Sequence, residues 1–381
     1  MQFELAGEQA QIRDMVRSLA TKEFASKAAE IDEHGLYPEA NLSRLAELGL
    51  LGMLVPAPYG GSETGAVSYA IALEEVARGC ASTGVLMAVT NMVGETIYRF
   101  GSEEQRRRFL ADLFSGDGKA AFAITEPSAG SDAFGISTVA VPDGDAYVLN
   151  GSKNFITNGS RANVAIVTAV TQKEPGKQIS AFLVESGTRG YSSGRPERKL
   201  GLRGSDTVSL TFEDCRVPRR NLLGGEGEGF RIVMAALDGG RVGIASQAIG
   251  IARAAVASAI SYAKERKQFG QPLSEFQAIQ WMLADSETEL DAAGLLALRA
   301  AHRKETGYPF TREAAAAKVF ASEAAYRACH RAVQILGGYG YMREYPVERH
   351  LRDVKVTSIY EGTSEIQRII IARDLLREGY R

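Results

Sequence analysis

A single carboxylate, Glu361, stands between a tyrosine and a glycine in the segment IYEGTSEIQR, residues 359–368. Ser364 and Gln367 have the spacing of a helix capping box, which predicts that a final helix begins at Ser364. Glu361 precedes this cap and lies outside the turn in which a glutamate would only complement the helix dipole. A carboxylate held in such a loop can serve as a general base. A solvated surface charge is the alternative that the local sequence leaves open.

Three further segments combine residue types that can hold a flat, polar ligand. TEPSAGSD, residues 125–132, is dense in hydroxyls and turn-forming residues, so its backbone N–H groups can face a polar cofactor edge. KNFITNG, residues 153–159, places the ring of Phe155 and the hydroxyl of Thr157 on one strand face. QILGGYG, residues 334–340, ends a helix with more glycines than one cap needs. Each segment also fits a structural role, as a β-turn, a plain strand and a helix C-cap.

The glycine-rich run GGEGEG, residues 224–229, looks like a phosphate-binding loop but lacks the context of one. A dinucleotide-binding fingerprint follows a buried strand inside a βαβ unit, whereas this run follows VPRR, residues 217–220. Its two glutamates would also repel a pyrophosphate. We therefore interpret the run as an interdomain turn that enters a helix.

The overall composition excludes several classes of protein. The chain has 381 residues, with 44 Lys and Arg against 46 Asp and Glu, so it lacks the basic surplus of a nucleic-acid binder. The longest uncharged run, residues 79–94, is too short and too polar to span a membrane. Its 3 cysteines form no CxxC pair and its 4 histidines no close cluster, so we expect no metal site. The first residues do not form a secretory signal, and a cytoplasmic location is expected.

Hydrophobic patterns divide the chain into three regions, predicted as domains 1–118, 119–228 and 229–381. The first region carries apolar residues at helical spacing. In the second, polar and apolar residues alternate over 207–212 and a turn at 142–145 separates two short strands, which indicates a compact antiparallel β domain, a small barrel. The third is rich in small residues, as a tightly packed helical bundle requires. The predicted fold class is mainly α with a central β domain.

Taken together, TEPSAGSD, KNFITNG, RKQFG, QILGGYGY and IYEGTSEIQR resemble the acyl-CoA dehydrogenase family in order and spacing, along nearly the whole chain. The resemblance implies an N-terminal helical domain, a middle β-barrel and a C-terminal four-helix bundle, with FAD between barrel and bundle in a homotetramer. It also implies that Glu361 removes the α-proton of an acyl-CoA while a hydride leaves the β-carbon for the flavin.

The resemblance assigns further residues to the two ligands. The residues expected at the FAD are Phe122, Ile124, Thr125, Gly130, Ser131, Phe155, Ile156, Thr157, Arg266, Gln277, Gln334, Ile335, Leu336, Gly337, Gly338, Thr363, Ser364 and Glu365. Of these, Arg266, Gln277 and residues 334–338 are expected to reach the FAD of a neighbouring subunit. The residues expected at the acyl-CoA are Ser131, Asp238, Arg241 and Gly362.

Two positions depart from patterns that are common in relatives. Phe155 stands where many relatives have tryptophan, so an aromatic ring is retained without the indole N–H. Some relatives carry the base immediately before the arginine that matches Arg241. This chain has Gly240 at that position, which leaves Glu361 as the only candidate base.

The expected chemistry makes demands on the site. A thioester α-proton is too weak an acid for an ordinary carboxylate, so the site must stabilise the enolate, with the Glu361 backbone N–H and a flavin ribityl hydroxyl as the expected donors. Substrate binding is expected to expel water and raise the pKa of Glu361.

The substrate and partners are also implied by resemblance. LDGGRVGIASQAIGIA and QILGGYGYMREYPVERHLRD look most like the short-chain and short-branched-chain members, so a butyryl-like acyl-CoA is the expected substrate. The expected electron acceptor is an electron-transfer flavoprotein. Medium-chain or methyl-branched substrates stay open, as do an oxygen-using oxidase and a non-catalytic helical assembly protein.

Overall fold

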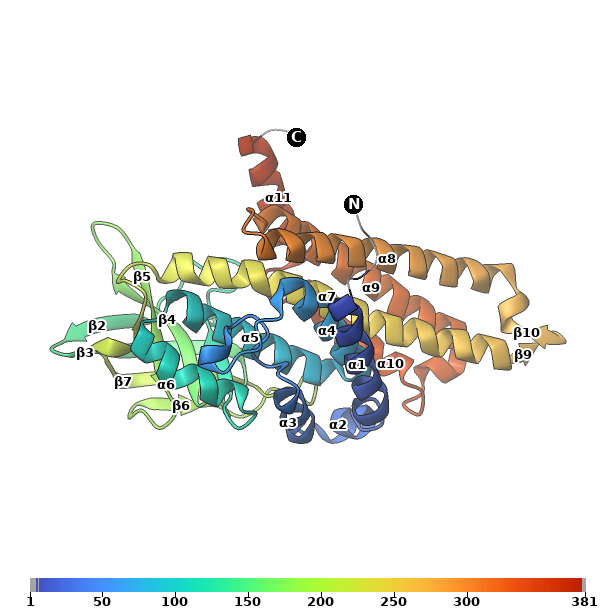
Figure 1. Cartoon of the computed structure of the whole chain (residues 1–381), viewed down its shortest axis with the longest axis horizontal. Coiled ribbons are helices and arrows are strands. Elements are labelled where there is room, and N and C mark those ends of the chain that lie inside the picture. The colour runs from blue at the N-terminus through green and yellow to red at the C-terminus, as the bar shows by residue number, and fades with distance from the viewer. Residues whose placement is uncertain (1–4, 6, 379–381) are drawn as a thin grey trace.

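The computed structural model describes residues 5 and 7–378, and its first part is a layer of helices (Figure 1). They are α1 (Gly7–Leu19), α2 (Ala28–His34), α3 (Glu39–Glu47), α4 (Gly65–Gly79), α5 (Ala81–Phe100) and α6 (Glu103–Phe114). A π-helical turn at Ala20–Phe24 extends α1. Helices α4 and α5 are buried around most of their circumference, as expected of helices that are apolar on more than one face.

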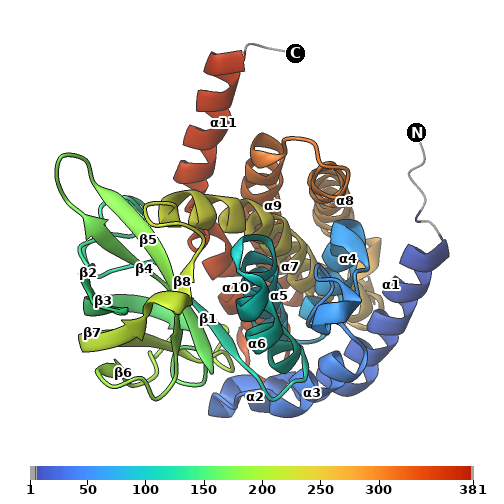
Figure 2. The same cartoon turned by 60° about the vertical axis from the view of Figure 1, so that its left-hand side comes forward.

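The middle of the chain is one curved, mixed sheet (Figure 2). Its strands are β1 (Ala120–Ala123), β2 (Val139–Asp143), β3 (Ala146–Thr157), β4 (Val164–Gln172), β5 (Gln178–Glu185), β6 (Tyr191–Ser193), β7 (Thr207–Pro218) and β8 (Leu222–Leu223). The strand order is β6-β7-β3-β2-β4-β5-β8, with β1 beside β4. The predicted hairpin is confirmed in β2 and β3. The expectation of a wholly antiparallel domain was wrong, because β1 and β2 pair in parallel with β4, and alternation along a strand carries no information about direction.

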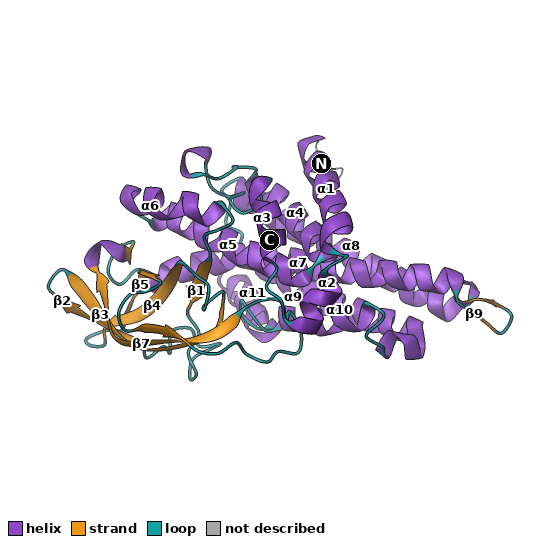
Figure 3. Cartoon of the chain, turned by 90° about the horizontal axis from the view of Figure 1, so that it is seen from below, coloured by secondary structure: helices purple, strands orange, loops and turns teal. Residues whose placement is uncertain are grey.

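The last part is helical again and holds the longest helices (Figure 3). Its elements are α7 (Gly229–Glu265), the hairpin β9 (Lys267–Gln268) and β10 (Gln271–Pro272), α8 (Gln277–Glu305), α9 (Thr311–Leu336), α10 (Val347–Val354) and α11 (Ser364–Glu378). Helices α7, α8 and α9 pack side by side through alanines and glycines, while α11 projects from the bundle (Figure 1).

Among the described residues, α7 is the one helix that is long and apolar enough to cross a membrane by length and composition. Its most apolar 18-residue window has a mean hydropathy of 1.4, and 72% of that window is buried inside the fold. The apolar surface of α7 is therefore core surface, which packs against α4, α5, α8 and α9.

The run at residues 224–229 is a turn between the sheet and α7, as predicted. The Gly225 N–H donates to the Glu228 carboxylate at 2.8 Å. A Cβ on Gly229 would lie 2.4 Å from the carbonyl carbon of Ser180, so the glycine permits α7 to start directly against the sheet.

The three regions meet at the segment that leads to Glu361. Arg352 on α10 donates two hydrogen bonds to the Asp32 carboxylate on α2, at 2.6 and 3.0 Å. Asp353 accepts a hydrogen bond from the Leu202 N–H, in the loop before β7, at 2.6 Å. These contacts fix α10 and, through it, the loop that carries Glu361.

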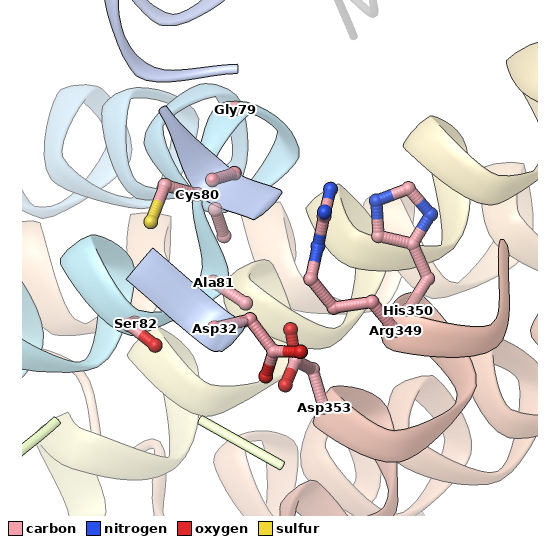
Figure 4. A pocket seen from close by; sticks show the side chains of 10 residues that line it. Asp32, Gly79, Cys80, Ala81, Ser82, Arg349, His350 and Asp353 are labelled. Atoms are coloured by element: carbon pink, nitrogen blue, oxygen red, sulfur yellow. The ribbon is translucent and has the colours of Figure 1, made fainter. Parts of the chain in front are cut away.

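A small cavity lies beside this junction, between α2, the α4–α5 connection and α10 (Figure 4). The carboxylates of Asp32 and Asp353 lie close together at its edge, with Arg349 and His350 opposite. Burial raises the pKa of Asp353 to about 6 and lowers that of His350 to about 3. His350 is therefore neutral at physiological pH, and the charges of the junction are those of the carboxylates and arginines.

We expect Asp32→Asn to lower the free energy of unfolding by about 2–4 kcal/mol, because it leaves the largely buried Arg352 with Glu348 as its remaining counter-charge. The matched control is Glu33→Gln on the same helix. Glu33 pairs with Arg343 where the side chains are 51% and 63% exposed, and exposed pairs contribute at most about 1 kcal/mol. Urea unfolding measures both, and equal losses would contradict a stabilising role for the junction.

Candidate active site

Glu361 lies in the loop between α10 and α11, in an unusual backbone conformation. φ is +53° at Glu361 and +88° at Gly362, so two consecutive residues are left-handed. Such a conformation costs free energy at a residue other than glycine. The Gln367 side-chain amide donates to the carbonyls of Glu361 and Gly362, at 3.1 and 2.8 Å, and Lys318 Nζ donates to the Gly362 carbonyl at 2.7 Å. These hydrogen bonds stabilise the turn.

Helix α11 begins at Ser364, as predicted, but the predicted capping box does not form. Thr363 Oγ1 accepts a hydrogen bond from the Ile366 N–H at 3.4 Å, so Thr363 caps the helix. Within the described part of the chain, the buried Ser364 hydroxyl has no partner. Gln367 is used instead by the turn at Glu361, a tertiary demand that the spacing of the two residues does not reveal.

The Glu361 carboxylate faces Gly240 on α7. A Cβ on Gly240 would lie 1.8 Å from Glu361 Oε2, so the glycine leaves the space that the carboxylate occupies. The two positions at which the family resemblance allows a base therefore converge on one point in this structure. Glu361 Oε2 is buried and has no hydrogen-bond partner among the described residues. Unpartnered buried carboxylates are costly and are concentrated in functional sites.

The surroundings of Glu361 favour a proton acceptor that works near neutral pH. Burial raises the pKa of Glu361 to about 7, against the opposing influence of Arg241 and Lys318. The backbone N–H of Glu361 makes no hydrogen bond to any described residue. Glu361 therefore offers both a proton acceptor and an N–H donor that is free among the described residues. Removal of a proton next to a carbonyl needs one group of each kind.

Three of the four residues predicted at the acyl-CoA lie near this carboxylate, two on α7 and one in the loop. Arg241 is 3% exposed and forms an ion pair with Asp238, which also accepts a hydrogen bond from the Thr311 hydroxyl at 2.6 Å. Gly362 directly follows Glu361. Ser131 lies apart from them, in an exposed loop of the sheet domain.

The loop that contains Thr125 to Ser131 is fixed to the sheet by a buried ion pair. Glu126 accepts hydrogen bonds from Lys153 Nζ at 2.8 Å and from the N–H groups of Ser137 and Thr138 at 2.6 and 3.0 Å. Burial alone would raise the pKa of Glu126, but the hydrogen bonds from Lys153 and Thr138 lower it to about 2. The carboxylate stays charged, so this loop is a preorganised surface.

Phe155 and Thr157 lie at the end of β3, beside that loop. They flank Ile156, whose side chain is buried in the core of the sheet domain. A β-bulge against β7 accompanies a φ of +59° at Phe155, and the ring is 62% exposed. The Asn154 N–H donates to the Thr125 carbonyl at 2.8 Å, which brings the two segments together. Ile156 can therefore face a ligand only through its backbone.

These two segments fit the edge of a flat, polar cofactor. Within the described residues, the hydroxyls of Thr125, Ser131 and Thr157 have no hydrogen-bond partner. Gly130 is exposed, and a Cβ there would meet no atom within 4 Å. Phe122 and Ile124 are half-buried beneath this surface, and Thr363, Ser364 and Glu365 belong to the Glu361 segment.

The remaining residues predicted at the cofactor lie at the opposite end of the molecule, around the β9–β10 hairpin (Figures 1 and 3). The Arg266 guanidinium lies 5.7 Å from the centre of the Tyr339 ring, and Gln277 is the first residue of α8. Gln334 is exposed, whereas Ile335 and Leu336 are buried in the core. One chain does not bring these residues to the sheet domain.

The chain's own fold requires glycine at only some positions of the cluster that ends α9. Gly337 has a φ of +59° and follows the helix as its cap. A Cβ on Gly340 would lie 2.4 Å from the Val333 carbonyl oxygen. A Cβ on Gly338 would meet nothing within 4 Å, so the chain's own packing does not require this glycine.

Two residues of the site were missed by sequence reasoning. Lys318 and Gln367 are both fully buried and hold the turn at Glu361. A signal for Lys318 exists, since it is the one charge in the alanine-rich run AAAAKVFAS, residues 314–322. For Gln367 the spacing from Ser364 predicts a capping residue, which gives no signal of its role at Glu361.

We expect Glu361→Gln to change how stability depends on pH. A carboxyl whose pKa is raised by folding, here from 4.5 to about 7, contributes stability below pH 4.5 that is lost as the pH rises through 7. The parent should therefore lose about 3 kcal/mol relative to the variant across this range. Melting temperatures at pH 5 to 8.5 measure this loss, and a constant difference between parent and variant would refute the buried, titrating carboxyl.

Comparison with known proteins agrees with the geometry. The acyl-CoA dehydrogenase N-terminal, middle and C-terminal domain families match residues 6–117, 121–215 and 227–376. A short-chain specific acyl-CoA dehydrogenase of Clostridium acetobutylicum is 46% identical over 99% of this chain and 100% of its own.

Two solved structures are also similar along the whole chain. Butyryl-CoA dehydrogenase from Megasphaera elsdenii has a TM-score of 0.96 and 44% identity, covering 99% of this chain and 100% of its own. A chain from a structure of the electron transferring flavoprotein of Acidaminococcus fermentans has a TM-score of 0.97 and 45% identity, with the same coverage. The chain described here belongs to the acyl-CoA dehydrogenase family, a family of FAD-dependent oxidoreductases.

Proposed function

We propose that this chain oxidises a short, butyryl-like acyl-CoA to the trans-2-enoyl-CoA, with Glu361 as the base. The observation that carries the proposal is the Glu361 carboxylate, which has a raised pKa, an unpartnered oxygen and a space provided by Gly240. The likeness to a butyryl-CoA dehydrogenase and to a short-chain specific relative supports the substrate class.

The residues around the carboxylate have separate roles in this proposal. Glu361 takes the α-proton on its carboxylate, while its backbone N–H donates to the thioester oxygen as negative charge develops there. A donor of this kind contributes about 3–4 kcal/mol to stabilising the transition state. Asp238, Arg241, Gly362 and Ser131 bind the acyl-CoA.

The same proposal assigns a cofactor surface. A bound FAD would supply the acceptor for the hydride that leaves the β-carbon. The exposed ring of Phe155 offers it an apolar face, and the free hydroxyls of Thr125, Ser131 and Thr157 offer hydrogen bonds. Phe122, Ile124, Gly130 and the Ile156 backbone complete this surface, and Thr363, Ser364 and Glu365 close over it.

A second copy of the chain completes the site in this proposal. Arg266, Gln277 and residues 334–338 lie at the far end of the bundle from the sheet domain (Figure 1). They can contact an FAD at the sheet domain only if the bundle end of one chain lies against the sheet domain of another. This requirement is consistent with a homotetramer. The Arg266 fork suits a pyrophosphate, which it can bind through two parallel hydrogen bonds.

The expected electron acceptor is an electron-transfer flavoprotein, supported by the likeness to a chain in a structure of such a protein. A cytoplasmic location is part of the same proposal, as are the domain boundaries at 118/119 and 228/229. Medium-chain and methyl-branched acyl-CoAs are the alternative substrates.

Glu361→Gln is expected to lower kcat by about 10³-fold with FAD still bound, because the amide cannot accept the α-proton. Gly240→Ala should also lower kcat, because its Cβ would displace the carboxylate. Gly294→Ala on α8 is the control, since its Cβ would meet only Arg253 Nη2, at 4.0 Å. Turnover with an artificial acceptor and flavin absorbance measure both effects. A Glu361→Gln enzyme with parental kcat would remove Glu361 from the mechanism.

The substrate assignment has its own test. We expect kcat/KM to be highest for butyryl-CoA and to fall for octanoyl-CoA and isovaleryl-CoA, by about 10-fold or more, since each methylene contributes about 1–3 kcal/mol of discrimination. A series of acyl-CoAs assayed under identical conditions gives the ranking. A higher kcat/KM for octanoyl-CoA or isovaleryl-CoA would contradict the short-chain assignment and indicate a medium-chain or methyl-branched substrate instead.

A further inference from the structure

One buried cation has no role in the chemistry proposed above. Lys318 lies in the middle of α9 among alanines, and its side chain is 0% exposed. Its Nζ donates to the Gly362 carbonyl at 2.7 Å, one residue after Glu361. In the part of the chain that the structure describes, no carboxylate lies within 4.0 Å of this ammonium. Burial of an ammonium without an ion pair costs free energy, so a structural reason for keeping a lysine here is weak.

The groups around Lys318 connect it to the base. Charges act on it from Glu361, from Arg241 on α7, from Glu365 on α11 and from Glu323 on its own helix. Arg241 is directly paired with Asp238. The positive charge of Lys318 is therefore less compensated than that of Arg241, and among the charged groups Glu361 acts on it most strongly.

A second donor binds the same carbonyl without carrying charge. The Gln367 amide reaches the Gly362 carbonyl at 2.8 Å, beside Lys318 Nζ at 2.7 Å. One hydrogen bond to this carbonyl could hold the turn. The charged donor adds an electric field at the carboxylate that the neutral donor does not supply.

We propose that Lys318 is a positioning residue for Glu361, which holds the left-handed turn through the Gly362 carbonyl and whose charge sets the pH range in which Glu361 accepts a proton. The proposal rests on the proposed role of Glu361 as the base. It goes further in assigning the tuning of that base to a residue on a different helix.

The two groups titrate in an order that suits this role. Burial lowers the pKa of Lys318 to about 8, and burial raises that of Glu361 to about 7. Lys318 is therefore still cationic while Glu361 loses its proton, and it favours the charged carboxylate. The other groups that face the carboxylate are Arg241, also cationic, and the Tyr69 and Tyr360 hydroxyls, which stay neutral because burial raises their pKa values.

The test uses Lys318→Met and Gln367→Leu in the holoenzyme, each compared with its own double variant that carries Glu361→Gln. The slope of the difference in melting temperature against pH is proportional to the fraction of Glu361 that is protonated in the folded protein, and the pH midpoint at which this slope falls to half reports the titration of Glu361 in each background. We expect Lys318→Met to raise this midpoint by about one pH unit, at the lower end of what a nearby opposite charge does. Gln367→Leu should leave the midpoint unchanged. The acidic limb of kcat/KM should move by the same amount as the midpoint.

Three further variants keep the test decisive. Lys318→Gln retains a donor but no charge and should shift the midpoint as Lys318→Met does, whereas Lys318→Arg should leave it at the parental pH. Lys304→Met, which removes the buried partner of Glu95, is the matched control and should leave the midpoint unchanged. An unshifted midpoint in Lys318→Met and Lys318→Gln, or a kcat/KM lowered equally at every pH, would overturn the proposal. The melting measurement requires no turnover. An inactive parent would therefore refute the proposed function, while the melting data would still decide whether Lys318 tunes the titration of Glu361.

Discussion

The structure depends on keeping one ionisable carboxyl away from water at a fixed point. Glu361 adopts a left-handed backbone conformation, and its carboxylate fills the space that Gly240 leaves on α7. Neither feature is stable on its own, because the conformation is strained and the buried oxygen lacks a partner. The surrounding elements supply the compensation. Lys318 and Gln367 hold the turn, and the contacts of Arg352 and Asp353 fix the helix that leads to it.

The residues proposed for the site lie at two opposite ends of the molecule. The proposed base, Glu361, and the loops of the sheet domain lie at one end of the helical bundle. Arg266 and the glycines after α9 lie at the other end, near β9 (Figure 3). The close packing of α7, α8 and α9 through small residues makes the intervening bundle rigid, so bending of one chain does not bring the ends together. In the proposed homotetramer a neighbouring chain would unite them, and Gly338, which the chain's own packing does not require, would then face that chain.

Much of this could be predicted from the sequence, for identifiable reasons. Glycine and proline positions, strand alternation and helical periodicity are local, so the hairpin of β2 and β3, the turn at 224–229 and the start of α11 were correct. Strand direction is a tertiary property, and the parallel pairing of β1 with β4 was missed. The capping box failed because Gln367 serves the turn at Glu361, and the role of Lys318 depends on a partner 44 residues away. Glu361 itself was identified by family resemblance, since its local sequence fits a surface charge equally well.

Single-turnover mixing with butyryl-CoA under anaerobic conditions, with the visible flavin band as the signal, tests the central claim most directly. We expect rapid bleaching of the parent with formation of crotonyl-CoA, and bleaching about 10³-fold slower in Glu361→Gln with the same FAD content. Parental bleaching rates in Glu361→Gln would contradict the claim that Glu361 is the base. A fully flavinated parent that no acyl-CoA bleaches would contradict the proposed reaction.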